Sequence, residues 1–255
     1  MRKLVIEKSA VKHNLSVIKS RAAGAVIYGV LTGDGGGCGA VPLAQLLRDE
    51  GIGRFAVSEV SEVEALRKAG FVDEEILMLR STTDPEELGR LVDLNAVCTI
   101  SSVDTGMALN ALAENRSTVV EAHIQVDTGM GYGGFLVSEP EKILLAYRSL
   151  PNVALSGIYT QLHAARPKDP EARGQLEQFK QVLSTIHAAG FETGTVHAAG
   201  SFALLHDDSA RLEGVRVGSA ILGRCRRTKD DNLKTVGYGL APLSEVRWLP
   251  TCRRS

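Results

Sequence analysis

The chain has 255 residues, which fits one large domain or two small ones and is close to the usual length of a (β/α)8 barrel. Hydrophobic residues make up 44% of the chain and charged residues 23%, as in ordinary globular proteins, which excludes a disordered chain. The formal net charge is −1 and no long run carries one sign, which argues against a nucleic-acid or membrane-surface partner.

The N-terminal segment and the cysteines indicate a cytoplasmic protein. Met1–Leu15 begins with basic residues but lacks the apolar core of a signal peptide, and no apolar stretch reaches the roughly 18 residues that span a membrane. Cys38, Cys98, Cys225 and Cys252 lie far apart without a CxxC pair, which argues against a disulfide framework and a zinc site. We therefore expect a reducing compartment, no metal, and a small-molecule ligand or anion as partner.

Short apolar runs rich in β-branched residues alternate with helical segments along most of the chain. The eight runs that predict strands are Ala25–Val30, Arg54–Val57, Glu75–Leu79, Ala96–Ile100, Val119–Val126, Val153–Tyr159, Thr195–His197 and Leu212–Val215. Apolar residues at helical spacing predict helices over Ser9–Ala22, Ser58–Ala69, Asp84–Asp93 and Glu171–Ala188. This alternation favours a (β/α)8 TIM barrel, an α/β fold, with an open doubly wound sheet as the alternative.

The pattern changes after residue 223. Cys225–Leu233 is charged and resembles a loop, whereas Val236–Leu249 alternates between apolar and polar residues like a strand. The remaining sequence offers that strand no partner. We therefore assign residues 1–223 to the barrel, and residues 224–255 to a linker with the truncated start of a C-terminal β domain.

The active site of such a barrel lies at the carboxyl ends of its strands. Ser201 would begin a short helix after the seventh strand, and Gly218 and Ser219 follow the eighth. A hydroxyl and backbone N–H groups at this place predict a cup for phosphate or sulfate, with a simple helix cap at Ser201 as the alternative. Gly33–Gly39 lacks the GK[ST] ending of a phosphate loop, which favours a tight turn there.

Four stretches together resemble the N-terminal domain of alanine racemase, a fold-type III pyridoxal phosphate (PLP) enzyme. They are VDTGMG at Val126–Gly131, GIYT at Gly157–Thr160, VH-A-x-x-S at Val196–Ser201 and VRVGSAILG at Val215–Gly223. The resemblance covers roughly Met1–Leu222. It implies that Arg216 faces the pyridine nitrogen of PLP, and that Ser201 and Gly218 belong to its phosphate site. It also implies a dimer in which each second domain covers the partner's barrel mouth.

The chain departs from this family at five positions of one pocket. Thr32 stands where the family has its Schiff-base lysine, and Gly36 where it has a tyrosine that contacts the phosphate. Tyr132 replaces an arginine and Gln161 a histidine. Gly200 replaces an asparagine or aspartate before the cup serine. Tyr132 offers an aromatic face to a ligand.

We interpret these changes as a pocket emptied by engineering for a new ligand or reaction, with no racemase activity. On this interpretation no cofactor is required, PLP binds only non-covalently, phosphate or sulfate occupies the cup, and the protein is a monomer or weak homodimer. One alternative is an inactive natural homologue that binds an anion or free PLP. Another is a scaffold without a small-molecule role. A third is a Cys–His hydrolase in which Cys38 pairs with His163 or His197.

Overall fold

The computed structural model describes residues 3–163, 169–225, 231–240 and 242. Its strands are β1 (Lys3–Ile6), β2 (Val26–Val30), β3 (Arg54–Val57), β4 (Glu75–Met78), β5 (Cys98–Ile100), β6 (Val120–Asp127), β7 (Phe135–Leu136), β8 (Val153–Thr160), β9 (Thr195–Ala199), β10 (Gly214–Val217) and β11 (Gly237–Leu240). Its helices are α1 (Lys8–Ala22), α2 (Thr32–Gly37), α3 (Ala40–Asp49), α4 (Val60–Lys68), α5 (Pro85–Asp93), α6 (Val103–Asn115), α7 (Pro140–Ser149), α8 (Pro170–Ala188), α9 (Ser201–His206) and the 3-10 turn Asp208–Ala210.

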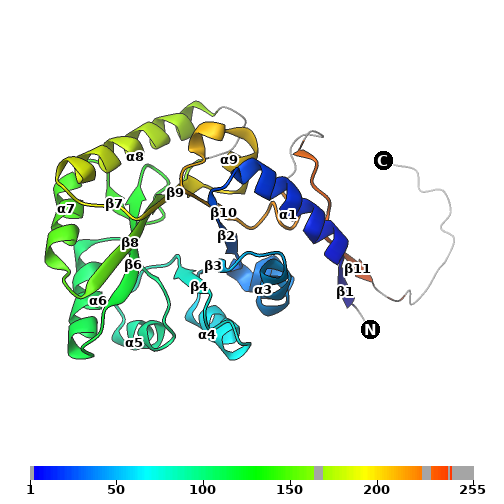
Figure 1. The fold of residues 1–255 in the computed structure, drawn as a ribbon, viewed down its shortest axis with the longest axis horizontal. Coiled ribbons are helices and arrows are strands. Elements are labelled where there is room, and N and C mark those ends of the chain that lie inside the picture. Colours follow the sequence, from blue (N-terminus) through cyan, green and yellow to red (C-terminus); the bar gives the residue numbers. More distant parts are fainter. Residues whose placement is uncertain (1–2, 164–168, 226–230, 241, 243–255) are drawn as a thin grey trace, which may run out of the picture.

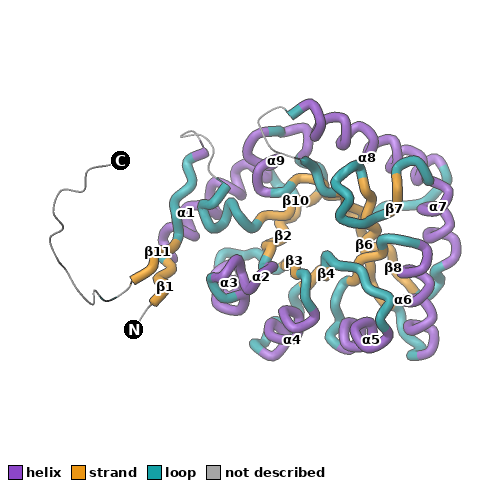
Figure 2. The backbone as a smooth tube through the Cα atoms, turned by 180° about the vertical axis from the view of Figure 1, so that it is seen from behind, coloured by secondary structure: helices purple, strands orange, loops and turns teal. Residues whose placement is uncertain are grey.

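Parallel strands form a ring with the helices outside it, as the strand–helix alternation predicts (Figures 1 and 2). The strand order is β4-β3-β2-β10-β9-β8-β6-β5, and the two ends of this series meet at a bridge between Leu77 and Val97. There the Met78 N–H donates to the Val97 carbonyl at 2.8 Å. The ring is therefore closed, which confirms the barrel, and the open doubly wound alternative is wrong.

Two apolar layers stabilise the barrel. The helices pack their apolar faces on the outside of the strands, where Leu47, Leu66 and Phe179 are fully buried. Inside the ring, Tyr28, Ala56, Leu77 and Val97 form a second, smaller cluster. Successive side chains of a strand point to opposite faces, so each strand serves both layers. This double burial explains why the strands are near-continuous apolar runs in the sequence.

The strand expected near residue 236 does have a partner. β11 pairs in antiparallel register with β1, from Lys3 opposite Leu240 to Ile6 opposite Gly237. The expectation of a strand without a neighbour is therefore wrong, because its neighbour comes from the other end of the sequence. Figure 1 shows this pair beside α1. Residues 243–255 lie outside the described part, and their assignment to a second β domain stays a prediction.

No helix in the described part of the chain is long and apolar enough to cross a membrane. The cytoplasmic location expected from the sequence stays a prediction.

Candidate functional site

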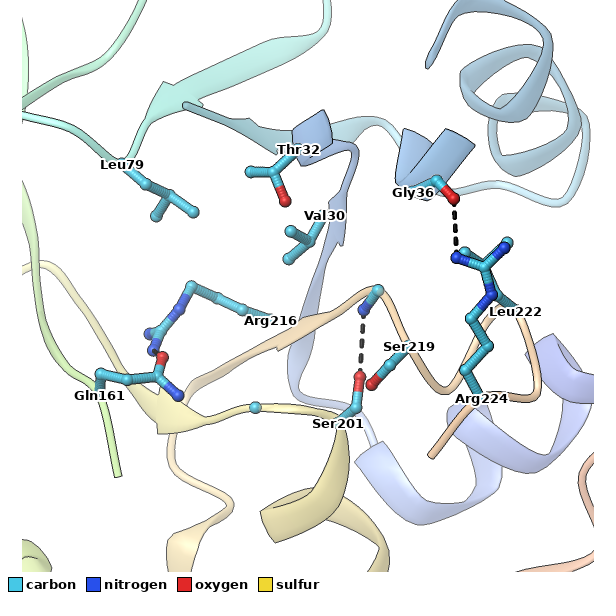
Figure 3. A pocket seen from close by; sticks show the side chains of 12 residues that line it. Val30, Thr32, Gly36, Leu79, Gln161, Ser201, Arg216, Ser219, Leu222 and Arg224 are labelled. Atoms are coloured by element: carbon cyan, nitrogen blue, oxygen red, sulfur yellow. Dashed lines mark hydrogen bonds between the residues drawn. The ribbon is translucent and has the colours of Figure 1, made fainter. Parts of the chain in front are cut away.

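A cavity of about 330 Å³ lies at the carboxyl ends of the strands (Figure 3). The predicted residues that line it are Thr32, Gly36, Gln161, Gly200, Ser201, Arg216, Gly218 and Ser219. The structure adds Val30, Leu79, Leu222 and Arg224, which the sequence analysis did not select. Arg224 directly follows the VRVGSAILG stretch, and that adjacency was the signal that could have identified it.

Arg216 lies at the inner end of the cavity and is only 4% exposed. Its guanidinium donates to the carbonyl of Thr160 at 2.7 Å and to the Gln161 side-chain oxygen at 3.0 Å. A third bond, of 2.7 Å, goes to Nδ1 of His197. All three acceptors are neutral groups. Arg216 is thus a buried cation held in one orientation without a carboxylate partner among the described residues.

The hydrogen bonds of Arg216 fix the tautomers of two buried histidines. A guanidinium only donates, so Nδ1 of His197 accepts and its Nε2 carries the proton. Nε2 then donates to Nδ1 of His123 at 2.9 Å. The His197 ring stacks on Tyr28 and Tyr159, with ring centroids 5.1 and 5.0 Å apart. This chain of rings connects the barrel interior to the cavity and orients Arg216.

Burial, followed by the charge of Arg216, keeps both histidines neutral. These causes lower the pKa of His123 to about 3 and that of His197 well below its usual value. The unfolded chain therefore binds protons on these rings as the pH falls below about 6.5, while the folded chain does not. Each histidine removes up to about 1.4 kcal/mol of stability for each pH unit below that value.

We accordingly expect the free energy of unfolding to fall between pH 7 and pH 5.5. Urea titrations across this range measure the slope, and His123→Gln should reduce it. The variant His187→Gln, at an exposed histidine of α8, serves as the control and should keep the wild-type slope. A free energy that stays constant over this range would contradict neutral burial of the pair.

The His123 ring packs directly against Gly157, where a side chain would leave it no space. A Cβ built there would lie 2.5 Å from Cε1 and Nε2 of His123. We expect Gly157→Ala to lower the free energy of unfolding by roughly 1–3 kcal/mol, the usual range for overpacking in a core. Gly174→Ala in α8 is the matched control, because nothing lies within 4 Å of its Cβ. Denaturant unfolding compares the two, and equal stabilities would refute the close packing.

Ser201 lies where the predicted cup requires it. Its Oγ accepts the backbone N–H groups of Gly218 and Ala220, both at 3.1 Å (Figure 3 shows the first). These two N–H groups are therefore engaged within the protein. A hydroxyl that accepts twice still has one hydrogen to donate, and Ser201 can direct it to a ligand. The anion cup itself stays a prediction.

α2 is a left-handed turn built from glycines. Gly33, Asp34, Gly35 and Gly36 have φ between +54° and +64°, a region that favours glycine. The Asp34 carboxylate accepts the Ala40 N–H at 2.8 Å at the start of α3. The turn places the carbonyl of Gly36 toward the loop after β10, where Arg224 Nη1 donates to it at 2.7 Å. The stretch forms a turn, as its missing GK[ST] ending predicts.

The other predicted site residues do not line this cavity. Tyr132 is 71% exposed on the glycine-rich loop after β6 and is not among the residues that line the cavity, so it does not lie in the pocket where the sequence places it. His163 Nδ1 lies 3.3 Å from a carboxylate oxygen of Glu171. His197 is fully buried, and the Cys38 Sγ lies 4.0 Å from Arg224 Nη2. The cysteine and the two histidines thus have different partners and form no catalytic pair.

No group of three or more His, Cys, Asp or Glu residues suited to a metal ion occurs in the described ranges. The sequence predicts a monomer or weak homodimer. Because the structure describes a single chain, this oligomeric state stays a prediction.

Comparisons with known proteins agree on one family. The Alanine racemase, N-terminal domain family matches residues 6–225. Alanine racemase of Carboxydothermus hydrogenoformans is 34% identical over 214 residues, which are 84% of this chain and 57% of that protein. The structure of Clostridium difficile 630 alanine racemase in complex with cycloserine has a TM-score of 0.86 and 25% identity, and covers 92% of this chain and 66% of that one.

One further solved structure bears on the cofactor. Alanine racemase from Bartonella henselae with covalently bound pyridoxal phosphate has a TM-score of 0.81 and 22% identity, covering 93% of this chain and 65% of that one. The prediction that no cofactor is required is contradicted by these comparisons together, because the chain matches proteins named alanine racemase at 30–34% identity and a solved alanine racemase of the same fold contains pyridoxal phosphate. The present chain spans less than two thirds of the length of the curated racemases that it matches, for example 59% and 57%.

The engineered-scaffold interpretation is also wrong. It assumes that the departures from the family are confined to one pocket, but these racemases are only 30–34% identical to the chain over 214–222 residues, so most of the matched positions differ. Such divergence indicates a natural racemase relative rather than a scaffold altered at one site. That these relatives are named alanine racemase speaks against the inactive homologue and the Cys–His hydrolase. With a family match over residues 6–225 and these identities, the chain belongs to the alanine racemase N-terminal domain family.

Proposed function

We propose that this chain binds pyridoxal phosphate at the barrel mouth and serves the racemisation of an amino acid, the reaction for which its relatives are named. The observation that carries the proposal is the buried cation Arg216 at the inner end of the cavity, with only neutral partners. Burial of an uncompensated charge is costly, so the site favours a ligand that accepts hydrogen bonds or carries negative charge.

Two parts of pyridoxal phosphate fit the residues present. The phosphate needs hydrogen-bond donors, and the hydroxyls of Ser201 and Ser219 lie at the cavity beside Gly218. The pyridine nitrogen needs one donor, and the Arg216 guanidinium supplies it. Burial lowers the pKa of Arg216 to about 10, so this side chain still carries its proton at neutral pH. A ring nitrogen that faces it therefore accepts a hydrogen bond and stays unprotonated.

The aldehyde end does not fit in the same way. Thr32 lines the cavity where the family has its Schiff-base lysine, and no lysine is among the described lining residues. A threonine hydroxyl cannot form an imine. We therefore derive no covalent step at the cofactor. In this proposal Ser201 and Ser219 would hold the phosphate and Arg216 would orient the ring.

When bound, pyridoxal phosphate supplies an electron sink for chemistry at the α-carbon of an amino acid. The contribution of this chain is orientation. Arg216 cannot rotate without breaking its bonds to Thr160, Gln161 and His197. A cofactor ring bound there would meet a donor of fixed position, and fixed positioning of reacting groups can supply a large part of an enzyme's rate enhancement.

Equilibrium titration with pyridoxine 5′-phosphate tests the binding, because its alcohol forms no Schiff base with surface lysines. We expect saturable binding that Ser201→Ala weakens and that Ser184→Ala, on the exposed side of α8, leaves unchanged. Formation of D-alanine from L-alanine with added pyridoxal phosphate tests the reaction. Lack of saturable binding would overturn the whole proposal. Binding without D-alanine would remove its racemase part.

A further inference from the structure

Arg224 connects two loops that are far apart in the sequence. It follows the turn after β10, and its Nη1 donates to the carbonyl of Gly36, 188 residues earlier, at 2.7 Å (Figure 3). The side chain lines the same cavity as Ser201, Gly218 and Ser219. A guanidinium has five N–H donors, and the bond to Gly36 uses one of them. A second contact joins Nη2 of Arg224 to the Cys38 Sγ at 4.0 Å. The remaining donors are available to a ligand in the cavity.

Gly36 makes room for this arginine. A Cβ at residue 36 would lie 3.1 Å from Nη1 of Arg224 and 2.8 Å from Cδ1 of Leu222. Its φ of +64° also favours glycine. The tyrosine that the family has at this position, as the resemblance implies, would therefore require both side chains to move from the positions seen here. Gly36 therefore leaves the space in which the Arg224 guanidinium lies.

The cavity is positively charged. Arg216 and Arg224 both line it, and no aspartate or glutamate does so in the part of the chain that the structure describes. Arg216 is buried, and its hydrogen-bond partners are all neutral. The Gly36 carbonyl that holds Arg224 is neutral as well. Two cations around one cavity favour an anionic ligand.

We infer that Arg224 binds the phosphate group of the ligand, in place of the tyrosine hydroxyl that the family offers from position 36. The inference rests on the proposed function for the identity of the ligand as a phosphate ester. Guanidinium matches the geometry of phosphate and binds it through charge-assisted hydrogen bonds, which are stronger than those of a neutral hydroxyl. The loss of the tyrosine is thus compensated from the opposite loop.

The test measures the dissociation constants of three probes by calorimetry: pyridoxine 5′-phosphate, pyridoxine and inorganic phosphate. The variants are Arg224→Gln, which removes the charge, and Arg224→Lys, which keeps it without the planar fork. Loss of a charge-assisted bond is expected to weaken pyridoxine 5′-phosphate roughly tenfold to a hundredfold in Arg224→Gln. Pyridoxine should bind within about twofold of wild type, because it lacks the phosphate. Arg224→Lys should recover part of the affinity.

Arg148→Gln is the matched control, since this exposed arginine ends α7 at the opposite end of the barrel. It should bind all three probes like wild type, and thermal unfolding checks that each variant is folded. Equal weakening of pyridoxine and its phosphate by Arg224→Gln would show a general effect on the loop and overturn the inference. Undiminished binding of pyridoxine 5′-phosphate would overturn it too, while the proposed function would stand.

The proposed function can also fail separately. If wild type binds inorganic phosphate in a manner that depends on Arg224 but does not bind pyridoxine 5′-phosphate, the anion role of Arg224 is supported and the cofactor proposal fails. If wild type binds neither phosphate nor its pyridoxine ester, both proposals fail.

Discussion

Thr32→Lys is expected to create a borohydride-reducible pyridoxal phosphate adduct at residue 32. Thr32 lines the cavity, so the amine of a lysine there enters the space beside Arg216 and Arg224. Two nearby cations lower the pKa of an amine, which increases its nucleophilic unprotonated fraction. Incubation with pyridoxal phosphate, reduction and peptide mapping by mass spectrometry measure the labelled fraction at residue 32.

Thr235→Lys is the matched control for this gain, because residue 235 is exposed and does not line the cavity. Labelling at residue 32 should exceed labelling at residue 235 by a large factor under the same conditions. Competition with pyridoxine 5′-phosphate should suppress the first adduct only. Similar labelling of the two introduced lysines would show that position 32 has no access to a bound cofactor.

Arg216→Met is expected to have the largest effect on stability in the site. The substitution keeps an unbranched stem but removes the guanidinium, which leaves Nδ1 of His197 and the carbonyl of Thr160 without the donor that they have now. An unsatisfied buried acceptor costs about 1–3 kcal/mol, and release of the buried charge offsets part of that cost. We expect a net loss of roughly 2–4 kcal/mol in the free energy of unfolding.

Urea unfolding measures this loss, and Arg148→Met on α7 provides the control. Loss of the Arg216 charge should also raise the pKa of His123 and His197, because that charge is the second cause of their lowered values after burial. Proton titration followed by NMR reports those shifts. Wild-type stability in Arg216→Met would mean that the guanidinium does not organise the interior of the barrel.

The barrel could be predicted because its signals are local. Each strand is a short apolar run buried on both faces, and the predicted runs agree with the observed strands within a few residues, as in Arg54–Val57 for β3. The starts of helices were also readable, since Asp84 accepts the N–H of Glu86 and Pro85 opens α5. Propensity, burial pattern and capping act over a few residues and leave a direct trace in the sequence.

The site was only partly predictable. Ser201 and Gly218 follow the last two strands of the ring, and Arg216 lies near the carboxyl end of β10, so the rule that sites lie at strand ends located them. Tyr132 was misplaced because the glycine-rich loop after β6 carries it into solvent. The pairing of Cys38 with a histidine failed because His197 lies inside the barrel, bonded to Arg216 and His123. Loop direction and side-chain depth depend on the assembled ring.

The sequence by itself therefore determined the strand–helix alternation, the chemistry available at each strand end, and the absence of an amine at position 32. Only the tertiary structure decided that β4 meets β5 to close the ring, that β11 pairs with β1, and that Arg224 reaches Gly36. The physical reason is the separation of these partners along the chain. Local forces fix the conformation of each segment, whereas contacts between distant segments follow from how the whole barrel closes and from the space that its packed side chains leave.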